Sequence, residues 1–398
     1  MKTYDVIVIG AGPAGSSAAR HTANNNLKTL LIDKSVFPRI KPCAAGLPKH
    51  IKEILDFDYS KVLKKISTAT IFTFNMKSPV KIQNDEVKIE MTMRSDFDTL
   101  LVENAVNSGV EFRDGQRAVG IEEDIDSVKV ITEKENYFAK YVIGADGAFS
   151  VVAKSLGLMK DRVMGWSINA EVYVSSGQLE RHGDMVNIEM GLVPAGYAWI
   201  FPKGDHLSCG IGTNMTKNIF NFKKYLFDYL NNHDSTKNYT KIFMKGHPLP
   251  HSYSEKIKIN TNRVFLAGDA ASLVEPLSGE GIYYAIKSGI TAAKHILENI
   301  RINSSPENYS KEIDNTLRKE FYYAERFARI FHQFPKLTYE LGVSNKLVNG
   351  KFLSLLTGGT TYQKMYEELK PLYSNAFFKP AVSIISKISS IVKKKVIR

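Results

Sequence analysis

Short apolar runs separated by glycine-containing turns mark the beginning and the middle of the chain. Val6–Ile9, Leu30–Ile32 and Val264–Leu266 contain no polar residue. Such uninterrupted runs are typical of strands that are buried on both faces of a parallel sheet. The pattern over residues 1–35 predicts strand, helix and strand in that order. The chain therefore opens like a doubly wound α/β unit.

Elsewhere the apolar and polar positions alternate, which predicts strands with one exposed face. We expect such strands at residues 69–74, 87–91, 128–132 and 137–143, and across most of 163–255. Ser95 and Asp98 have the spacing of a capping box, so a helix is predicted from there to Ser108, ending at Gly109. After residue 305 the pattern is helical and charged.

These elements predict an α/β fold with a Rossmann-like nucleotide-binding domain, an inserted antiparallel β-sheet domain for the substrate, and a helical C-terminal region. The nucleotide-binding domain is expected to be discontinuous. Its predicted segments are 1–65, 94–160 and 256–304; the β-rich domain comprises 66–93 and 161–255, and the helical region 305–398.

Composition narrows the class of protein only moderately. The chain has 398 residues, of which 43% are hydrophobic and 24% charged, as in ordinary globular proteins. It contains no run of eighteen apolar residues, and its first strand begins almost at once. Its two cysteines, Cys43 and Cys209, cannot form a disulfide framework. We therefore expect a cytoplasmic protein without a signal peptide.

The net charge of +12 favours an anionic membrane surface or an acidic redox protein as a partner. No nucleic-acid-binding module is visible, so nucleic acid is not expected. The alternative is that the positive charge reflects a lysine-rich proteome and has no functional meaning. Residues 381–392 have one apolar helical face, followed by Lys393–Lys395. That helix can lie on anionic lipid at the inner face of the membrane, or pack on its own protein.

A glycine-rich turn follows the first strand and carries the clearest chemistry. Gly10, Gly12 and Gly15 have the G-x-G-x-x-G spacing, with Ala14 among them, and Asp33 ends the second predicted strand. The turn brings backbone N–H groups close to a pyrophosphate, and the acid can accept hydrogen bonds from a ribose. Dinucleotide binding is predicted.

Two later motifs favour FAD. Residues 144–147 are an apolar strand end with the tight turn Gly-Ala-Asp-Gly, and residues 268–282 are a strand end, a loop and a helix start. In the second motif, Asp269 can bind a sugar-alcohol chain. Gly279 and Gly281 precede a helix predicted from about 281 to 298, whose positive end can face a pyrophosphate or a flavin carbonyl. A cofactor held at both ends needs both motifs.

Three aromatic residues share one face of a predicted strand. Tyr197, Trp199 and Phe201 are two residues apart, so their rings point to the same side. They form either plain core or one wall of a channel for a hydrocarbon chain. Phe72, Phe74, Tyr173 and Trp166 are candidates to extend it, although plain core packing is the favoured explanation for these four. His247 and His251 are separated by two prolines, so no metal site is predicted.

The chain resembles the FAD-dependent oxidoreductases of the para-hydroxybenzoate-hydroxylase fold over about residues 1–300. Within them it is most similar to the geranylgeranyl reductases, including the archaeal digeranylgeranylglycerophospholipid reductases. The closer match is carried by Tyr197–Gly204, which fits Y-x-W-x-F-P-K-G, and by the cysteine loop Pro42–Gly46. Ala44 and Ala45 stand in that loop where the family usually has two glycines, or glycine and an acid.

The resemblance implies contacts for individual residues. Gly12, Ala14 and Gly15 are expected at the pyrophosphate, and Asp33 at the ribose. The remaining expected cofactor contacts are Cys43, Ala44 and Gly46 near the isoalloxazine, Arg94 on the pyrophosphate side, Ala118 at the adenine, and Asp269, Gly281 and Ile282 at the ribityl chain and pyrimidine.

The activity implied is saturation of geranylgeranyl double bonds, on a lipid precursor or an isoprenoid diphosphate, by hydride transfer from reduced flavin. An isolated alkene needs a dry site, a proton and π faces that tolerate positive charge. Trp199 and its neighbours can supply the faces, while Cys43 or Tyr197 can help to supply the proton. NAD(P)H or a ferredoxin is the expected reductant. An aromatic monooxygenase or halogenase, or an electron-transfer flavoprotein for quinone, is the alternative.

Overall fold

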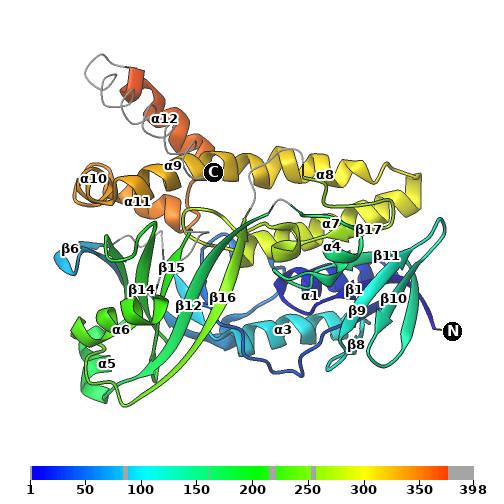
Figure 1. Ribbon diagram of the computed structural model, residues 1–398, viewed down its shortest axis with the longest axis horizontal. Helices are drawn as coiled ribbons and strands as arrows, with labels where there is room; N and C mark the ends of the chain where they lie inside the picture. The colour runs from blue at the N-terminus through cyan, green and yellow to red at the C-terminus, as the bar shows by residue number, and fades with distance from the viewer. Residues whose placement is uncertain (1, 84–87, 161, 215–220, 252–256, 375–398) are drawn as a thin grey trace.

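The computed structural model describes residues 2–83, 88–160, 162–214, 221–251 and 257–374, and only the backbone for 371–374. Two large sheets lie beside each other, and a layer of C-terminal helices runs along both (Figure 1). This is the predicted α/β class. The predicted amphipathic helix at 381–392 lies outside the described residues. Within the described part, no helix is both long and apolar enough to cross a bilayer.

The first sheet has seven strands in the described part of the chain, in the order β8-β2-β1-β11-β10-β9, with β17 also paired to β11. Its parallel half joins β1, β2, β8, β11 and β17, and the pairs that contain β10 are antiparallel. Its strands are β1 (Thr3–Ile9), β2 (Thr29–Ile32), β8 (Glu111–Arg113), β9 (Ala118–Glu123), β10 (Val128–Thr132), β11 (Asn136–Gly144) and β17 (Val264–Leu266).

Helices cover this sheet because its central strands are apolar on both faces. Val6, Ile7 and Val8 are fully buried. Helix α1 packs closely on α7, since a Cβ at Gly289 would stand 2.1 Å from the Ala14 carbonyl oxygen. The helices around the sheet are α1 (Pro13–Ala23), α3 (Arg94–Asn107), α4 (Val151–Ser155) and α7 (Ile282–Ile302).

The second sheet, in the order β16-β12-β15-β14-β13-β5-β6, is antiparallel except for the parallel pair β5 and β13. Its strands are β5 (Ala69–Phe74), β6 (Lys77–Ile82), β12 (Val163–Tyr173), β13 (Met185–Met190), β14 (Gly196–Pro202), β15 (Leu207–Thr213) and β16 (Lys241–His251). Helices α5 (Ser176–His182) and α6 (Phe222–Asn232) lie at one end of it (Figure 1). The segment order agrees with the predicted insertion, and the domain boundaries themselves stay a prediction.

A small third sheet, β3-β7-β4, lies under the cysteine loop. It consists of β3 (Gly46–Leu47), β4 (Leu63–Ile66) and β7 (Glu90–Thr92), with the short helix α2 (Ile51–Ile54) nearby in the chain. The C-terminal layer contains α8 (Glu307–Ile313), α9 (Lys319–Gln333), α10 (Pro335–Thr338), α11 (Asn349–Leu356) and α12 (Tyr362–Ser374).

The predicted cap at Ser95 is wrong. Helix α3 begins at Arg94, its N-cap residue is Met93, and that cap makes no side-chain hydrogen bond. The Ser95 hydroxyl donates to Asp96, while Asp98 is held by arginines. Ion pairing with two cations is the stronger interaction for a buried carboxylate, so Asp98 does not serve the helix start. The predicted helix end is correct, because Gly109 adopts a φ of +94°.

Candidate functional site

A cavity of about 630 Å³ runs from the glycine turn after β1 to the C-terminal helices. Among the residues predicted to contact the cofactor or to form the aromatic wall on residues 197–201, only Gly15 does not line it. The lining residues among them are Gly10, Gly12, Ala14, Asp33, Cys43, Ala44, Gly46, Arg94, Ala118, Tyr197, Trp199, Phe201, Asp269, Gly279, Gly281 and Ile282. Segments from both large sheets and from the cysteine loop thus meet around one space.

The glycine turn leaves no room for side chains. Gly10 has a φ of +101°, and a Cβ there would be 2.3 Å from the Ala145 carbonyl oxygen. A Cβ at Gly15 would be 1.7 Å from the Gly10 carbonyl oxygen. Helix α1 starts at Pro13, between these two glycines, without a side-chain cap, so its first free N–H groups are left for a ligand. Gly15 acts through this close packing rather than by contact with the cavity.

Asp33 lies at the end of β2, where a ribose would be expected. Its carboxylate accepts hydrogen bonds from the backbone N–H of Ala11 at 2.7 Å and of Ser35 at 2.8 Å. These bonds fix the carboxylate and tie the glycine turn to β2. Each oxygen keeps a lone pair, and Ala118 borders the same end of the cavity. The arrangement fits the adenosine half of a dinucleotide.

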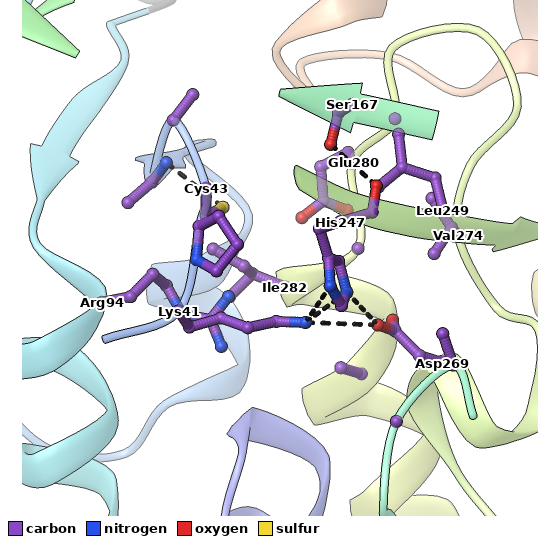
Figure 2. A pocket seen from close by; sticks show the side chains of 18 of the residues that line it. Lys41, Cys43, Arg94, Ser167, His247, Leu249, Asp269, Val274, Glu280 and Ile282 are labelled. Carbon is purple, nitrogen blue, oxygen red and sulfur yellow. Dashed lines mark hydrogen bonds and ion pairs between the residues drawn. The ribbon is translucent and has the colours of Figure 1, made fainter. Parts of the chain in front are cut away.

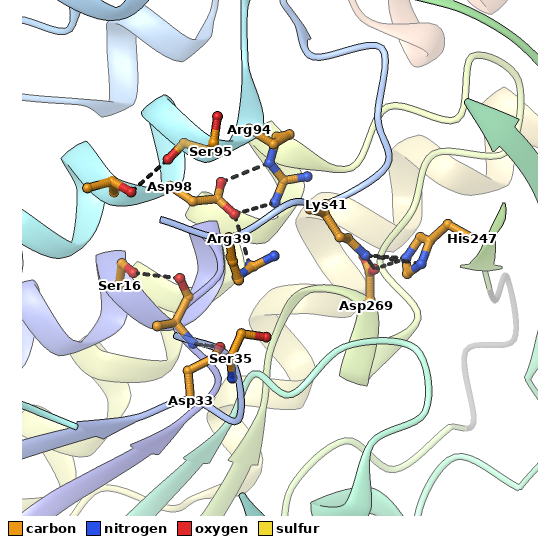
Figure 3. A network of polar contacts seen from close by, with 12 residues as sticks. Ser16, Asp33, Ser35, Arg39, Lys41, Arg94, Ser95, Asp98, His247 and Asp269 are labelled. Carbon is orange, nitrogen blue, oxygen red and sulfur yellow. Dashed lines mark hydrogen bonds and ion pairs between the residues drawn. The ribbon is translucent and has the colours of Figure 1, made fainter. Parts of the chain in front are cut away.

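Two arginines share one buried carboxylate beside this region. Asp98 is fully buried, and Arg94 binds it through Nε and Nη2 at 2.8 and 2.9 Å. Arg39 approaches the same carboxylate at 2.9 Å (Figure 3). Burial opposes the charge on Arg94, but Asp98 outweighs it and raises the pKa of the guanidinium. The pair presents fixed positive charge to an anionic ligand.

Lys41, His247 and Asp269 form a second polar cluster, as Figures 2 and 3 show. The Lys41 ammonium contacts the His247 ring and lies 3.9 Å from Asp269, and His247 Nε2 lies 3.5 Å from the same carboxylate. Burial lowers the pKa of Lys41 to about 8. Burial opposes ionisation of Asp269, but His247 and Lys41 together lower its pKa. Sequence reasoning gave Lys41 and His247 no role.

The cysteine loop is held in place by a buried lysine that sequence reasoning also missed. Lys203, in the F-P-K-G stretch, is only 2% exposed. Its ammonium donates to the carbonyl oxygens of Ala44, Ala45 and Thr92, the last two at 3.3 and 2.8 Å. Burial lowers its pKa to about 8. The F-P-K-G motif could have indicated this role, because a lysine that directly follows a buried apolar strand needs hydrogen-bond acceptors around its ammonium group.

The Cys43 thiol borders the cavity within this loop. Its sulfur accepts a hydrogen bond from the Ala45 N–H at 3.3 Å. Ala45 has a φ of +47°, a conformation that glycine adopts more easily than alanine. Gly46 faces Phe201 so closely that a Cβ would be 2.6 Å from the ring. The alanine at position 45 thus adopts a left-handed backbone conformation in this loop.

Tyr197, Trp199 and Phe201 face the cavity from β14, and Ala198 and Ile200 face the opposite side. The ring centroids of Tyr197 and Trp199 are 5.7 Å apart. The Tyr197 hydroxyl donates to the Ser278 carbonyl, which joins this wall to the loop before α7. The strand alternation predicted from the sequence is therefore correct.

Beyond these aromatic rings the cavity continues as an apolar arm. Phe72 on β5, Ile188 on β13, Phe331 on α9, and Leu353 and Leu356 on α11 line it. Of the residues proposed to extend the channel, only Phe72 lines it. Tyr173 stacks on His206 with centroids 4.9 Å apart, and Trp166 is 39% exposed.

Comparisons with known proteins give these features a family context. A family model described as "FAD binding domain" matches residues 3–313. The digeranylgeranylglycerophospholipid reductase of Thermoplasma acidophilum is 31% identical over 338 residues, which cover 81% of this chain and 85% of that protein.

Two solved structures extend the comparison. A geranylgeranyl bacteriochlorophyll reductase-like protein from Thermoplasma acidophilum has a TM-score of 0.76 and 27% identity, covering 94% of this chain and 100% of that one. A flavin-dependent brominase, Bmp2, has a TM-score of 0.72 at 19% identity, covering 93% and 100%, and it shows the fold alone. FAD is thus the dinucleotide for which this cavity is built.

Proposed function

Because this chain belongs to the FAD-binding family that includes the digeranylgeranylglycerophospholipid reductases, we propose that it saturates the double bonds of geranylgeranyl chains. The substrate is a membrane-lipid precursor or an isoprenoid diphosphate. The family establishes a FAD-dependent oxidoreductase. The choice of substrate is our inference from the cavity.

The apolar arm is the observation that carries this proposal. An aromatic monooxygenase needs space for one ring, whereas this cavity is also lined by Phe72, Phe331 and Leu356. These side chains belong to or pack against one apolar cluster, which Tyr197 also contacts. Such a lining suits a flexible hydrocarbon, whose burial releases about 0.8 kcal/mol for each methylene group. Tyr197 and Cys43 line the same cavity, so a chain bound in this arm would bring a double bond toward the cofactor end.

Bound and reduced FAD supplies the hydride in this reaction. Within the chain, we assign different roles to the cysteine loop and to the aromatic rings. Cys43 borders the substrate side of the cofactor, and Trp199 offers a π face that stabilises positive charge as the alkene is protonated. Tyr197 fixes the distance between β14 and the loop before α7 through its bond to Ser278.

The test is anaerobic reoxidation of the dithionite-reduced holoprotein by digeranylgeranyl phospholipid or geranylgeranyl diphosphate. Native protein should recover oxidised-flavin absorbance and give products heavier by H₂ for each bond saturated. A fully saturated lipid should leave the flavin reduced. If no geranylgeranyl compound reoxidises the flavin, the proposal is wrong.

A variant tests the arm itself. Leu356→Trp should fill the arm and reduce turnover of geranylgeranyl chains at least tenfold, with FAD binding unchanged. Leu347 is 90% exposed in the turn before α11, so Leu347→Trp is the matched control. Equal turnover by both variants would remove the arm from the binding site.

Two reductants fit the protein, NAD(P)H and an acidic ferredoxin. The net charge of +12 favours the second through electrostatic docking. High salt should then inhibit reduction by ferredoxin but not by dithionite. Salt-insensitive reduction by NADPH at a comparable rate would favour the nucleotide.

A further inference from the structure

Glu280 occupies the turn between Gly279 and Gly281, directly before α7, and lines the cavity (Figure 2). Its Oε1 accepts the backbone N–H of Tyr283 at 2.8 Å. Its Oε2 is shielded from solvent and has no hydrogen-bond partner among the described residues. A buried carboxyl oxygen without a partner is costly, so it indicates either a proton on the group or a ligand beside it.

The surroundings of Glu280 favour the protonated form. Burial raises its pKa to about 8, and the nearby Glu275 adds to the shift, against the helix N–H groups of α7. Glu275 is satisfied by the backbone N–H groups of Leu277 and Ser278, at 2.6 and 2.7 Å. Tyr283 and Tyr284 are the other titratable groups close enough to interact with Glu280. Near neutral pH the carboxyl therefore carries a proton.

The other candidate groups at this end of the cavity are less suited to give a proton. Trp199 Nε1 and His332 Nδ1 also line the cavity without a partner among the described residues, but an indole N–H is not acidic, and burial lowers the pKa of His332 to about 4, so its ring is neutral near pH 7. The Tyr197 hydroxyl donates to Ser278, and burial raises its pKa. The Cys43 sulfur accepts from Ala45. Lys41 and His247 are paired with Asp269. Glu280 is therefore the remaining acid, and its Oε2 has no other hydrogen-bond partner among the described residues.

We propose that Glu280 is the proton donor in the reaction of this site, which rests on the proposed function. Its carboxyl gives a proton to one alkene carbon and becomes a carboxylate. The other carbon receives the hydride drawn from reduced FAD, so the double bond gains two electrons and two hydrogens. Water restores the proton to Glu280 after the product has left. The N–H groups at the start of α7 stabilise the carboxylate in the meantime.

The decisive variant is Glu280→Gln, because glutamine keeps the acceptor for Tyr283 and lacks the acidic proton. Glu189 is the matched control. It is a fully buried glutamate on β13 with one unpartnered oxygen among the described residues, its pKa is raised by burial, and it does not line the cavity. Glu280→Asp keeps the acid on a shorter stem and separates chemistry from packing.

All measurements on these variants use the holoprotein. Glu280→Gln should retain FAD and accept electrons from dithionite, yet lose about 100-fold or more in the rate of reoxidation by a geranylgeranyl lipid. Glu280→Asp should lose less, and Glu189→Gln should match native protein. The infrared difference between native protein and Glu280→Gln should contain the band of a protonated carboxyl at neutral pH, without any substrate.

The outcomes separate the two proposals. Reoxidation by Glu280→Gln within a few-fold of native protein, or an infrared difference that shows only ionised carboxylate, overturns the role of Glu280 and leaves the proposed function standing. Failure of native protein to saturate any geranylgeranyl chain overturns the proposed function, and the role of Glu280 in that reaction falls with it.

Discussion

The two ends of the cavity are lined by different kinds of chemical group, polar at one end and mainly apolar at the other. At the end beside the glycine turn, where we expect the adenosine half of FAD, backbone N–H groups, the Asp33 carboxylate and the Arg94–Asp98 pair surround the space. At the other end the lining is largely aromatic and aliphatic, with a few polar side chains such as Glu280, Asn214 and His332. The buried Lys203 holds the adjoining cysteine loop. We therefore expect cofactor binding and reaction with the substrate to depend on separate residues, so that mutation should separate them.

The largest effect is expected at the adenosine end, from Gly15→Val. A side chain there meets the Gly10 carbonyl oxygen, because even a Cβ would be only 1.7 Å away. The turn cannot form without moving β1 against α1, so the protein should be purified without FAD and should be destabilised by about 3 kcal/mol or more. Absorbance of the purified protein and urea unfolding measure the two effects.

Gly350→Ala is the control for this variant, since a Cβ at Gly350 meets nothing within 4 Å. It should retain FAD and native stability. A Gly15→Val protein that is purified yellow would contradict the close packing described for the turn.

At the aromatic end, Lys203→Met should have the next largest effect. The change leaves the carbonyls of Ala44, Ala45 and Thr92 without their shared donor, and each unpaired buried acceptor costs about 1–3 kcal/mol. Partial relaxation should limit the loss of unfolding free energy to about 2–4 kcal/mol. Urea unfolding measures it, and turnover should fall because the loop that carries Cys43 is displaced.

Lys129 offers the comparison for that variant, because its ion pair with Glu122 is on the surface. Lys129→Met should change stability by less than about 1 kcal/mol. Equal losses in both variants would mean that Lys203 does not hold the loop.

The difference between the two ends also explains what could be predicted from the sequence. The glycine turn and Asp33 are close in sequence, and their spacing alone fixes the local geometry. The alternation of Tyr197, Trp199 and Phe201 likewise needs only one strand. The predicted fold class and FAD therefore followed from local patterns.

The missed residues act across long sequence separations. Lys41 and His247 are 206 positions apart, and Lys203 reaches Ala44 across 159. No local pattern links such partners, because only the packing of the two large sheets brings them together. The apolar arm was missed for the same reason, since α9 and α11 close it from the far end of the chain. The Ser95 cap failed because Arg39, outside the motif, competes for Asp98.

A pH experiment sharpens the contrast at the substrate end. Below about pH 4.5 both folded and unfolded chains carry the Glu280 proton, and from there to about pH 8 only the folded chain does. The stabilisation that protonated Glu280 gives to the folded state is therefore present at low pH, and it is lost as the pH rises through that window. Glu280→Gln lacks the effect, so its stability relative to native protein should rise by about 3–4 kcal/mol from about pH 5 to about pH 8.

Urea unfolding of both proteins at several pH values, with equal FAD, measures this difference. Glu103→Gln changes an exposed glutamate on α3 and should show no such trend. A constant difference between Glu280→Gln and native protein across the window would mean that the pKa of Glu280 is not raised.

The smallest predicted effect separates the two ends most cleanly. Arg39→Lys keeps a positive charge near Asp98 but loses the planar guanidinium that approaches this carboxylate at 2.9 Å and lies over Phe37 at 5.3 Å. We expect FAD affinity to fall by a few-fold, which is about 1 kcal/mol. Turnover of a geranylgeranyl lipid at saturating FAD should stay at the native value, because Arg39 serves the end that binds the cofactor.

Titration of apoprotein with FAD and turnover at saturating FAD give the two numbers. Arg20→Lys is the control, since Arg20 pairs with the exposed Asp56 outside the cavity, and it should change neither. If Arg39→Lys reduces turnover at saturating FAD as much as it weakens FAD binding, the adenosine end and the substrate end are coupled. The separation of binding from chemistry would then have to be abandoned in favour of a single cooperative site.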